Sequence, residues 1–315
     1  MECTPETIQE TLQEYGCAIV PNVLSSKEAI AMQRGMWDTL ECLTQKWTTP
    51  VNRENPSSWK EMLKLHPSHS MLLQHYHIGH APFIWNVRQN PKCVNIFSKL
   101  WNCEPEDLLC SYDGASFHMP HEITGRGSFR STWFHVDQSY TRNDFECIQS
   151  WVTGYEVRPG DATLSILTKS HLYHKEIAGR FSLTDKNDWT KLTDEQIQAY
   201  LDLGCEKKRI TCPRGSMVLW DSRTVHCGVE PLPDRTRPNF RCVAYLCYMP
   251  KKMAAPKMIQ KHVNAFHEKR MTTHWPCKVK LFGKTPRLYP NDILYDTTPL
   301  PDPTLTELGK SLIGL

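Results

Sequence analysis

The sequence predicts a mainly β domain decorated with helices (α+β class), with an antiparallel sandwich or barrel as its core. Three observations lead to this prediction. From residue 108 onward, short apolar and β-branched runs alternate with turn residues at a close spacing, which favours antiparallel strands over β-α-β units. Before residue 108 and after residue 250, apolar residues recur at helical spacing. The length of 315 residues without an internal repeat is compatible with one domain.

Residues 1–107 are predicted to be mostly helical. Thr4 can cap a first helix that has Pro5 at its first position and ends at Tyr15, before a glycine. A short apolar strand over residues 17–23 follows this helix.

A second helix is predicted to begin at a capping box formed by Ser25 and Glu28. Its apolar residues, three and four positions apart, predict one buried stripe. These residues are Ala29, Met32, Met36 and Leu40. A further helix is predicted over residues 90–101.

The expected β core covers residues 108–250. Its predicted strands span residues 108–113, 115–119, 133–136, 148–156, 208–212, 215–221 and 239–248. An insertion over residues 172–205 reads as partly helical. Asp194 and Glu195 favour a helix start there, without a capping box at Thr193.

The C-terminal extension covers residues 251–315. Its first part, residues 251–270, is basic and amphipathic and predicts a helix. The basic residues have two interpretations, either contact with an anionic substrate or nucleic acid, or a solvated helix face, and the solvated face is favoured.

One stretch of the core points to chemistry. His135 and Asp137 stand two apart in an expected strand, so both project to one face while Phe134 and Val136 face the other way. His226 follows a second strand far downstream. Two histidines and a carboxylate with open positions are diagnostic of non-haem Fe(II) oxygenases. We call His135, Asp137 and His226 the metal triad, although H-x-D patterns also occur by chance among 14 histidines.

Five further histidines crowd between residues 66 and 80. They are His66, His69, His75, His77 and His80. Their spacing matches no known ligand pattern cleanly, so a loop bordering the mouth of the site, or an inert surface loop, is favoured over a second metal site.

The metal triad, together with Arg241 at the start of a later strand, resembles the phytanoyl-CoA dioxygenase family of Fe(II)/2-oxoglutarate-dependent oxygenases. Residues 160–171, which end in Ser170 and His171, resemble a further segment of that family, with Thr168-Lys169 in place of its usual Pro-Gly. The resemblance covers residues 8–250. It implies a double-stranded β-helix (jelly roll, cupin-like) core flanked by N-terminal and C-terminal helices, within a single oxygenase domain.

The resemblance also implies the cofactors. The metal triad would hold Fe(II), with 2-oxoglutarate and O2 at the remaining positions, and the substrate would be hydroxylated with release of succinate and CO2. Related halogenases carry a small residue in place of the carboxylate ligand, so Asp137 favours hydroxylation. The far carboxylate of 2-oxoglutarate would bind Arg241, which opens a strand. Arg235 and Arg237 stand nearer the interval common in the family, and Arg237 is the alternative.

Four other side chains are candidates for the cosubstrate pocket. Gln149 and Trp151 are two apart on one predicted strand and share a face, although ordinary core positions are equally compatible with the pattern. His118 and Trp133 are weaker candidates. Ser170 and His171 either support the site or cap a turn.

Composition limits the partners. A net charge of +3 is too mild to imply nucleic acid, and no run of about 18 apolar residues predicts a membrane span. Thirteen cysteines without a C-x-x-C pair, together with an N-terminus unlike a signal peptide, predict a cytoplasmic location.

The favoured substrate is a small molecule or acyl conjugate. One alternative is hydroxylation of a protein or nucleic acid, which the basic residues 125–130 and 251–270 would serve. Another is a jelly-roll binding module without catalysis.

Overall fold

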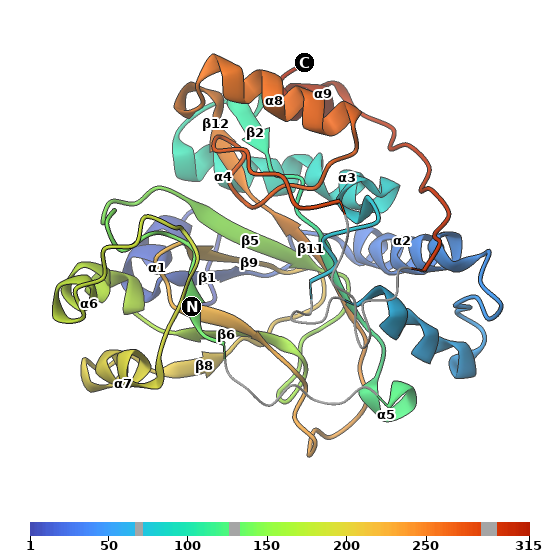
Figure 1. Cartoon of the computed structure of the whole chain (residues 1–315), viewed down its shortest axis with the longest axis horizontal. Helices are drawn as coiled ribbons and strands as arrows, with labels where there is room; N and C mark the ends of the chain where they lie inside the picture. Colours follow the sequence, from blue (N-terminus) through green and yellow to red (C-terminus); the bar gives the residue numbers. More distant parts are fainter. Residues whose placement is uncertain (67–71, 126–132, 285–294) are drawn as a thin grey trace.

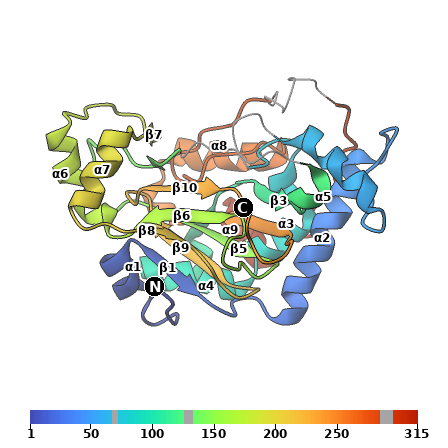
Figure 2. The same ribbon diagram turned by 90° about the horizontal axis from the view of Figure 1, so that it is seen from below.

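The computed structural model describes residues 1–66, 72–125, 133–284 and 295–315. Two five-stranded antiparallel sheets face each other at its centre (Figures 1 and 2). The first sheet has the order β1 (Cys17–Val20), β9 (Met217–Asp221), β5 (Ile148–Thr153), β11 (Arg241–Leu246) and β3 (Ala115–His118). The second has the order β7 (Thr190–Lys191), β4 (His135–Val136), β10 (His226–Val229), β6 (Thr163–Leu167) and β8 (Lys207–Arg209). A two-stranded sheet pairs β12 (Tyr248–Pro250) with β2 (Leu108–Cys110). The predicted double-stranded β-helix core with flanking helices is therefore confirmed.

Strand alternation divides the first sheet into an inner and an outer face. Trp151, Val218 and Val243 point inward and pack with Leu164 and Ile166 of the second sheet. Their neighbours on the same three strands point outward and pack against helices. Because side chains alternate along a strand, one sheet can serve a helical layer on one side and the site on the other.

Helices cover the outer face of the first sheet (Figure 2). They are α1 (Ile8–Tyr15), α2 (Ser26–Thr44), α3 (Pro82–Arg88) and α4 (Pro91–Trp101). In α2 the predicted capping box is present, with the Ser25 amide donating to Glu28 at 2.7 Å and the Glu28 amide donating to the Ser25 hydroxyl at 3.3 Å. The predicted stripe of α2 is buried as well.

The first helix begins later than predicted, at Ile8 instead of Pro5. The Cys3 amide donates to the Ile19 carbonyl at 2.9 Å, so the preceding residues run beside β1. The chain then needs a turn at Thr4–Thr7, closed by the Thr7 amide on the Thr4 carbonyl at 3.1 Å, before it can become helical. Strand β1 itself joins the first sheet, so the β structure is not confined to residues 108–250.

The insertion carries α6 (His174–Arg180) and α7 (Asp194–Asp202). Both pack on the outer side of the second sheet, where Phe134 and Val136 meet them. A capping box does exist at Thr193, contrary to the prediction. The partner is Gln196. Its backbone N–H donates to the Thr193 hydroxyl at 3.2 Å, and its side-chain oxygen accepts from the backbone N–H of Thr193 at 2.8 Å. An amide side chain fills this role as well as a carboxylate does.

The C-terminal extension carries α8 (Pro256–His267), as predicted, and α9 (Glu307–Ile313). Figure 1 shows both helices beside β2 and β12. His262 fixes α8 there, because its two ring nitrogens contact the carbonyls of Ile313 at 2.9 Å and Cys110 at 2.6 Å. Short 3-10 helices span Pro56–Leu65, Ile78–His80, Pro105–Asp107, Ser170–Tyr173 and Lys251–Met253, and α5 spans His121–Thr124. Within the described ranges, no helix is long and apolar enough to cross a membrane.

Candidate metal centre and its cavity

The metal triad converges on one point. His135 lies on β4, Asp137 follows it directly, and His226 opens β10, which pairs with β4 at His226 and His135. One ligand atom from each residue lies within 4.8 Å of the others. The Asp137 carboxylate oxygen Oδ2 is 3.5 Å from His135 Nε2 and 3.2 Å from His226 Nε2. In the part of the chain that the structure describes, no other group of three such residues meets this criterion.

Both imidazoles are held in the same tautomer. His135 Nδ1 donates to the Trp133 carbonyl at 3.1 Å, and His226 Nδ1 donates to the Thr224 carbonyl at 2.8 Å. Each Nε2 therefore keeps its lone pair for a ligand. The indole of Trp220 donates to His226 Nε2 at 3.2 Å, which requires the same tautomer, because an indole N–H is only a donor. Trp133 also stacks on His135 with centroids 4.8 Å apart.

Asp137 is positioned from two sides. Its amide donates to the Ser222 carbonyl at 3.0 Å, and the Gln149 side chain donates to its Oδ2 at 2.9 Å. Burial opposes ionisation, but the imidazoles of His135 and His274 help to hold the pKa of Asp137 well below its ordinary value. The carboxylate is thus ionised and oriented, as a metal ligand must be.

This donor set fits a divalent iron ion. Two imidazole nitrogens and one carboxylate oxygen, all buried, face one point with the remaining directions open to a cavity. Such a facial arrangement with open positions is typical of non-haem Fe(II) sites. The carbonyls that orient both imidazoles supply the outer hydrogen bonds that such ligands need.

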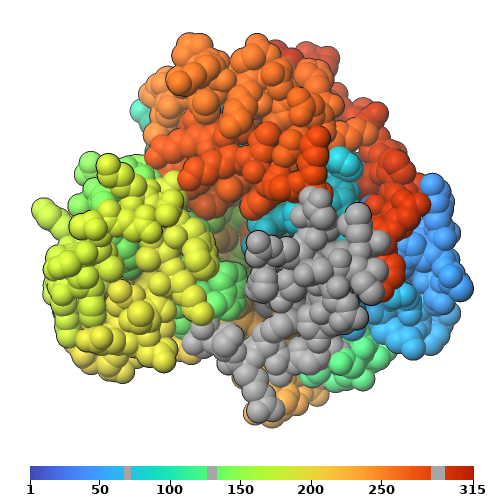
Figure 3. Space-filling model, viewed as in Figure 1, coloured from blue at the N-terminus to red at the C-terminus, as the bar shows by residue number. Residues whose placement is uncertain are grey.

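The metal triad lines a cavity of about 640 Å³. A hollow is visible in Figure 3 between the yellow-green insertion and the orange-red start of the C-terminal extension. Residues 187–189 of the insertion, residues 273–275 of the extension, and Leu72 and Gln74 all line this cavity. Its aromatic lining residues are Trp133, Trp189, Trp220, Tyr245, Trp275 and Phe282. A volume of this size suits a small molecule.

Arg241 lies in the same cavity and is 5% exposed. Its Nε donates to the Ser116 hydroxyl and its Nη1 to the Ala162 carbonyl, both at 3.0 Å, and its guanidinium lies 5.5 Å from the Trp151 ring centroid. These bonds use two of its five N–H donors. It has no ion pair with any carboxylate among the described residues. A buried cation without a counter-charge is costly, so this position calls for an anionic ligand.

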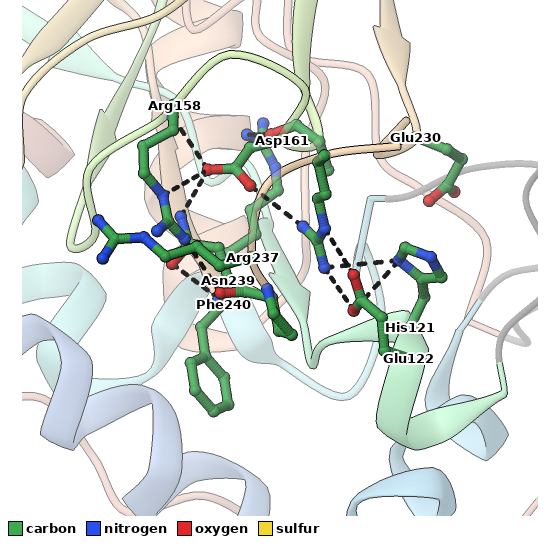
Figure 4. Close-up of polar contacts among 12 residues, drawn as sticks. His121, Glu122, Arg158, Asp161, Glu230, Arg237, Asn239 and Phe240 are labelled. Carbon is green, nitrogen blue, oxygen red and sulfur yellow. Dashed lines mark hydrogen bonds and ion pairs between the residues drawn. The ribbon is translucent and has the colours of Figure 1, made fainter. Parts of the chain in front are cut away.

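The other two arginines lie elsewhere. Arg235 pairs with Glu122 at 2.6 Å and with Asp161 at 3.1 Å. Both carboxylates are labelled in Figure 4. Arg237 is 67% exposed and reaches Glu156 at 3.4 Å. Neither lines the cavity of the metal triad. Of the three, only Arg241 combines burial, free donors and the right cavity.

The remaining predicted residues are distributed around this site. Gln149 lines the cavity, Trp151 lies beneath the Arg241 guanidinium, and Trp133 lines the cavity beside His135. His118 is paired with Arg241 across two strands but does not line the cavity.

Ser170 and His171 lie outside the cavity and support β10 indirectly. The Ser170 hydroxyl accepts from the Val225 amide at 2.8 Å, directly before His226. His171 packs near Gly16, whose φ is +74°, and a Cβ built on Gly16 would lie 2.5 Å from the Thr224 hydroxyl oxygen and 2.6 Å from His171 Nδ1, so no side chain fits there. The glycine therefore permits the close packing that holds the Thr224 carbonyl in place.

The histidine-rich stretch forms no metal site within the described residues. His77 Nδ1 and His80 Nε2 contact the carbonyls of Lys269 at 2.7 Å and Arg270 at 3.0 Å. His69 lies outside the described residues. The stretch does border the cavity, through Leu72 and Gln74 and not through the imidazoles of His66, His75, His77 and His80.

Sequence reasoning missed several lining residues. Asp113 and His274 both line the cavity, as does Trp189. Asp113 stands with Gly114 between two strands and reads as an ordinary turn. Trp189 lies in the insertion and His274 in the C-terminal extension, and no local sequence pattern predicts the path of either segment.

Comparisons with known proteins agree with this fold. No family model matches the chain. Over 279 residues it is 26% identical to "Ava biosynthesis cluster protein O" of Aspergillus versicolor, covering 85% of each protein. The resemblance to the phytanoyl-CoA dioxygenase family therefore stays a prediction.

Three solved structures illustrate the likeness. A hypothetical protein from Escherichia coli superposes with a TM-score of 0.58 at 14% identity, over 99% of this chain and 82% of that one. The non-heme alpha ketoglutarate dependent carbocyclase SnoK from nogalamycin biosynthesis superposes with a TM-score of 0.50 at 17% identity, over 79% of this chain and 87% of that one. EctD from S. alaskensis, solved with 2-oxoglutarate and 5-hydroxyectoine, gives 0.50 at 14% identity, over 77% and 74%. These likenesses establish that the chain shares its fold with these three proteins.

Proposed function

We propose that this protein is an Fe(II)- and 2-oxoglutarate-dependent dioxygenase of the phytanoyl-CoA dioxygenase type that hydroxylates a small molecule. One observation carries the proposal. The metal triad, in which both imidazoles carry their proton on Nδ1 and leave Nε2 unprotonated, shares a cavity with Arg241, a buried cation that has no carboxylate partner among the described residues. The arrangement supports an iron ion and a dicarboxylate bound side by side.

The similar proteins support the choice of cofactors and substrate class. SnoK is described as alpha ketoglutarate dependent, and EctD was solved with 2-oxoglutarate. The relative in Aspergillus versicolor is named for a biosynthesis cluster, which favours a small-molecule substrate. We propose that residues 1–315 form one oxygenase domain, and the thirteen free thiols suit a reducing compartment such as the cytoplasm.

The side chains divide the work. Gln149 holds the Asp137 carboxylate in its orientation, and the two carbonyl-bound imidazoles present their Nε2 atoms to the metal. Arg241 binds the far carboxylate of 2-oxoglutarate, with Trp151 supporting the guanidinium. The aromatic walls exclude water and orient the substrate. Bound Fe(II) would supply O2 activation coupled to oxidative decarboxylation of 2-oxoglutarate, one oxygen atom entering succinate and the other a substrate C–H bond.

An anaerobic titration with Fe(II) and then 2-oxoglutarate tests the proposal. The wild-type protein should develop the weak visible charge-transfer band of a chelated keto acid. His135→Ala should abolish the band. Arg241→Ala should keep it but require at least about tenfold more 2-oxoglutarate, because a charge-assisted contact is lost.

Arg237→Ala is the matched control, because it removes an exposed arginine from the same part of the chain. It should titrate like the wild type. Absence of the band in iron-loaded wild-type protein would refute the oxygenase proposal and favour a binding module. An equal effect of Arg237→Ala and Arg241→Ala would refute the assignment of Arg241.

A further inference from the structure

Asp113 is a buried carboxyl group in the cavity that the proposed iron chemistry does not use. It is 8% exposed and lines the cavity beside Gly114. The Ser111 hydroxyl donates to its Oδ2 at 2.9 Å. Among the described residues its other carboxylate oxygen has no hydrogen-bond partner, and the carboxylate forms no ion pair. Burial raises the pKa of Asp113 to about 7. An unpartnered buried carboxyl facing a cavity calls for a ligand that can donate to it.

Asp113 and Arg241 lie toward opposite ends of β11. The Tyr245 amide donates to the Gly114 carbonyl at 3.2 Å, so Gly114, next to Asp113, is level with Tyr245. Tyr245 is four residues along the strand from Arg241, a separation of about 13 Å. The cavity therefore has an anion-binding end at Arg241 and a separate acidic end at Asp113.

The nearest cation does not neutralise Asp113 directly. Arg88 on α3 donates to the main-chain carbonyl of Asp113 at 3.3 Å and to the Gly79 carbonyl at 2.6 Å. Its guanidinium packs over Trp85, 4.8 Å from the ring centroid. Arg88 lowers the pKa of Asp113, but its Nη1 and Nη2 donate to carbonyl oxygens, and no hydrogen bond joins it to the Asp113 carboxylate.

The other carboxylates that line the cavity already have partners or a role. Asp137 belongs to the metal triad. Asp188 pairs with Arg142 and, at 3.6 Å, with Lys280. Asp113 is therefore the one carboxyl group of the described cavity lining that remains for a substrate.

We propose that Asp113 anchors the substrate by binding a protonated nitrogen of a small, largely aromatic or polycyclic molecule. Charge complementarity with the free carboxylate selects the nitrogen, and the aromatic walls select flat apolar surface and attract the cation. This proposal rests on the proposed function, because it assigns the acidic end to substrate and the Arg241 end to 2-oxoglutarate.

Binding of matched probes to the holoenzyme tests the assignment without turnover. Protein loaded anaerobically with Fe(II) and 2-oxoglutarate is titrated by calorimetry with naphthylmethylamine and naphthylmethanol, and with phenethylamine and phenethyl alcohol. The wild type should bind at least one amine about tenfold or more tighter than its alcohol, because a charged donor strengthens the contact to a carboxylate. Asp113→Asn should remove this preference while alcohol binding changes less than about threefold.

Asp188→Asn is the matched control, because Asp188 lines the same cavity but has its own cationic partners. It should keep the amine preference. The proposal is overturned if no amine binds better than its alcohol, or if Asp188→Asn removes the preference and Asp113→Asn does not.

Circular dichroism shows whether Asp113→Asn is folded. Asp113→Glu keeps the charge and should therefore retain part of the preference for the amine over its alcohol. The keto-acid band separates the two proposals. A normal band without amine preference contradicts only the substrate assignment, whereas absence of the band contradicts the oxygenase itself.

Discussion

Replacing Asp113 by Asn should stabilise the folded protein at alkaline pH. The carboxyl group is buried, and its pKa is raised to about 7 from 3.8. Between these values the folded state holds a proton that the unfolded chain has released. The free energy of unfolding therefore falls as pH rises through this window. Asn resembles the protonated carboxyl in shape but cannot ionise, so it removes the penalty.

The magnitude follows from the width of the window. The two pKa values differ by about three units, and each unit corresponds to about 1.36 kcal/mol. Ionisation of Asp113 therefore lowers the free energy of unfolding by about 4 kcal/mol once Asp113 is fully ionised in both the folded and the unfolded state. The groups that face Asp113 are Arg88 and Asp137, together with the thiols of Cys110, Cys147 and Cys247. Arg88 favours the charged form, and Asp137 opposes it.

Urea unfolding of wild type and Asp113→Asn at pH 5 and pH 8 measures the effect. At pH 5 the variant should be more stable by only about 1.5 kcal/mol, because pH 5 lies little more than one unit above the unfolded-state pKa of 3.8. At pH 8, above both pKa values, the variant should be more stable by about 4 kcal/mol. Equal destabilisation at both pH values would show that Asp113 has an unseen cationic partner, and would refute the reasoning.

Two further predictions concern other parts of the structure. Gln149→Ala should weaken Fe(II) binding about 10- to 100-fold, measured by metal titration, because the donor that orients Asp137 is lost; unchanged affinity would contradict that role. The pKa of His80 is lowered to about 3 by burial, and its Nδ1 has no partner among the described residues, so charging it in the fold is unfavourable. The contribution of His80 to the free energy of unfolding should therefore fall by about 2–3 kcal/mol from pH 6.5 to pH 4.5, opposite in sign to the contribution of Asp113. His80→Gln, which can still donate to the Arg270 carbonyl, should remove this contribution, so its stability relative to the wild type should rise as pH falls; an identical pH dependence in both proteins would contradict the prediction.

The pair of His135 and Asp137 in the metal triad could be predicted from the sequence because strand periodicity is a local property, whereas His226 joins them through the pairing of β10 with β4. Because side chains alternate between the two faces of a strand, His135 and Asp137 lie on one face and Phe134 and Val136 on the other, and the structure shows both pairs in these positions. The capping box and buried stripe of α2 were predictable for the same reason, since they depend only on residues one helical turn apart. The capping box at Thr193 is equally local, because Thr193 and Gln196 are one helical turn apart.

The cavity was decided by tertiary structure. Its walls come from residues 72–74, from the insertion at 187–189 and from the extension at 273–282, which are brought together by long-range packing that no local pattern encodes. The same packing pairs Arg235 with Asp161 and Glu122 while leaving Arg241 without a carboxylate partner, so it distinguishes arginines that look alike in sequence. It also isolates Asp113, because whether a carboxyl group has a partner depends on every element packed around it. The sequence by itself therefore determined which residues face one another across a metal, and the fold decided which charges were left for ligands.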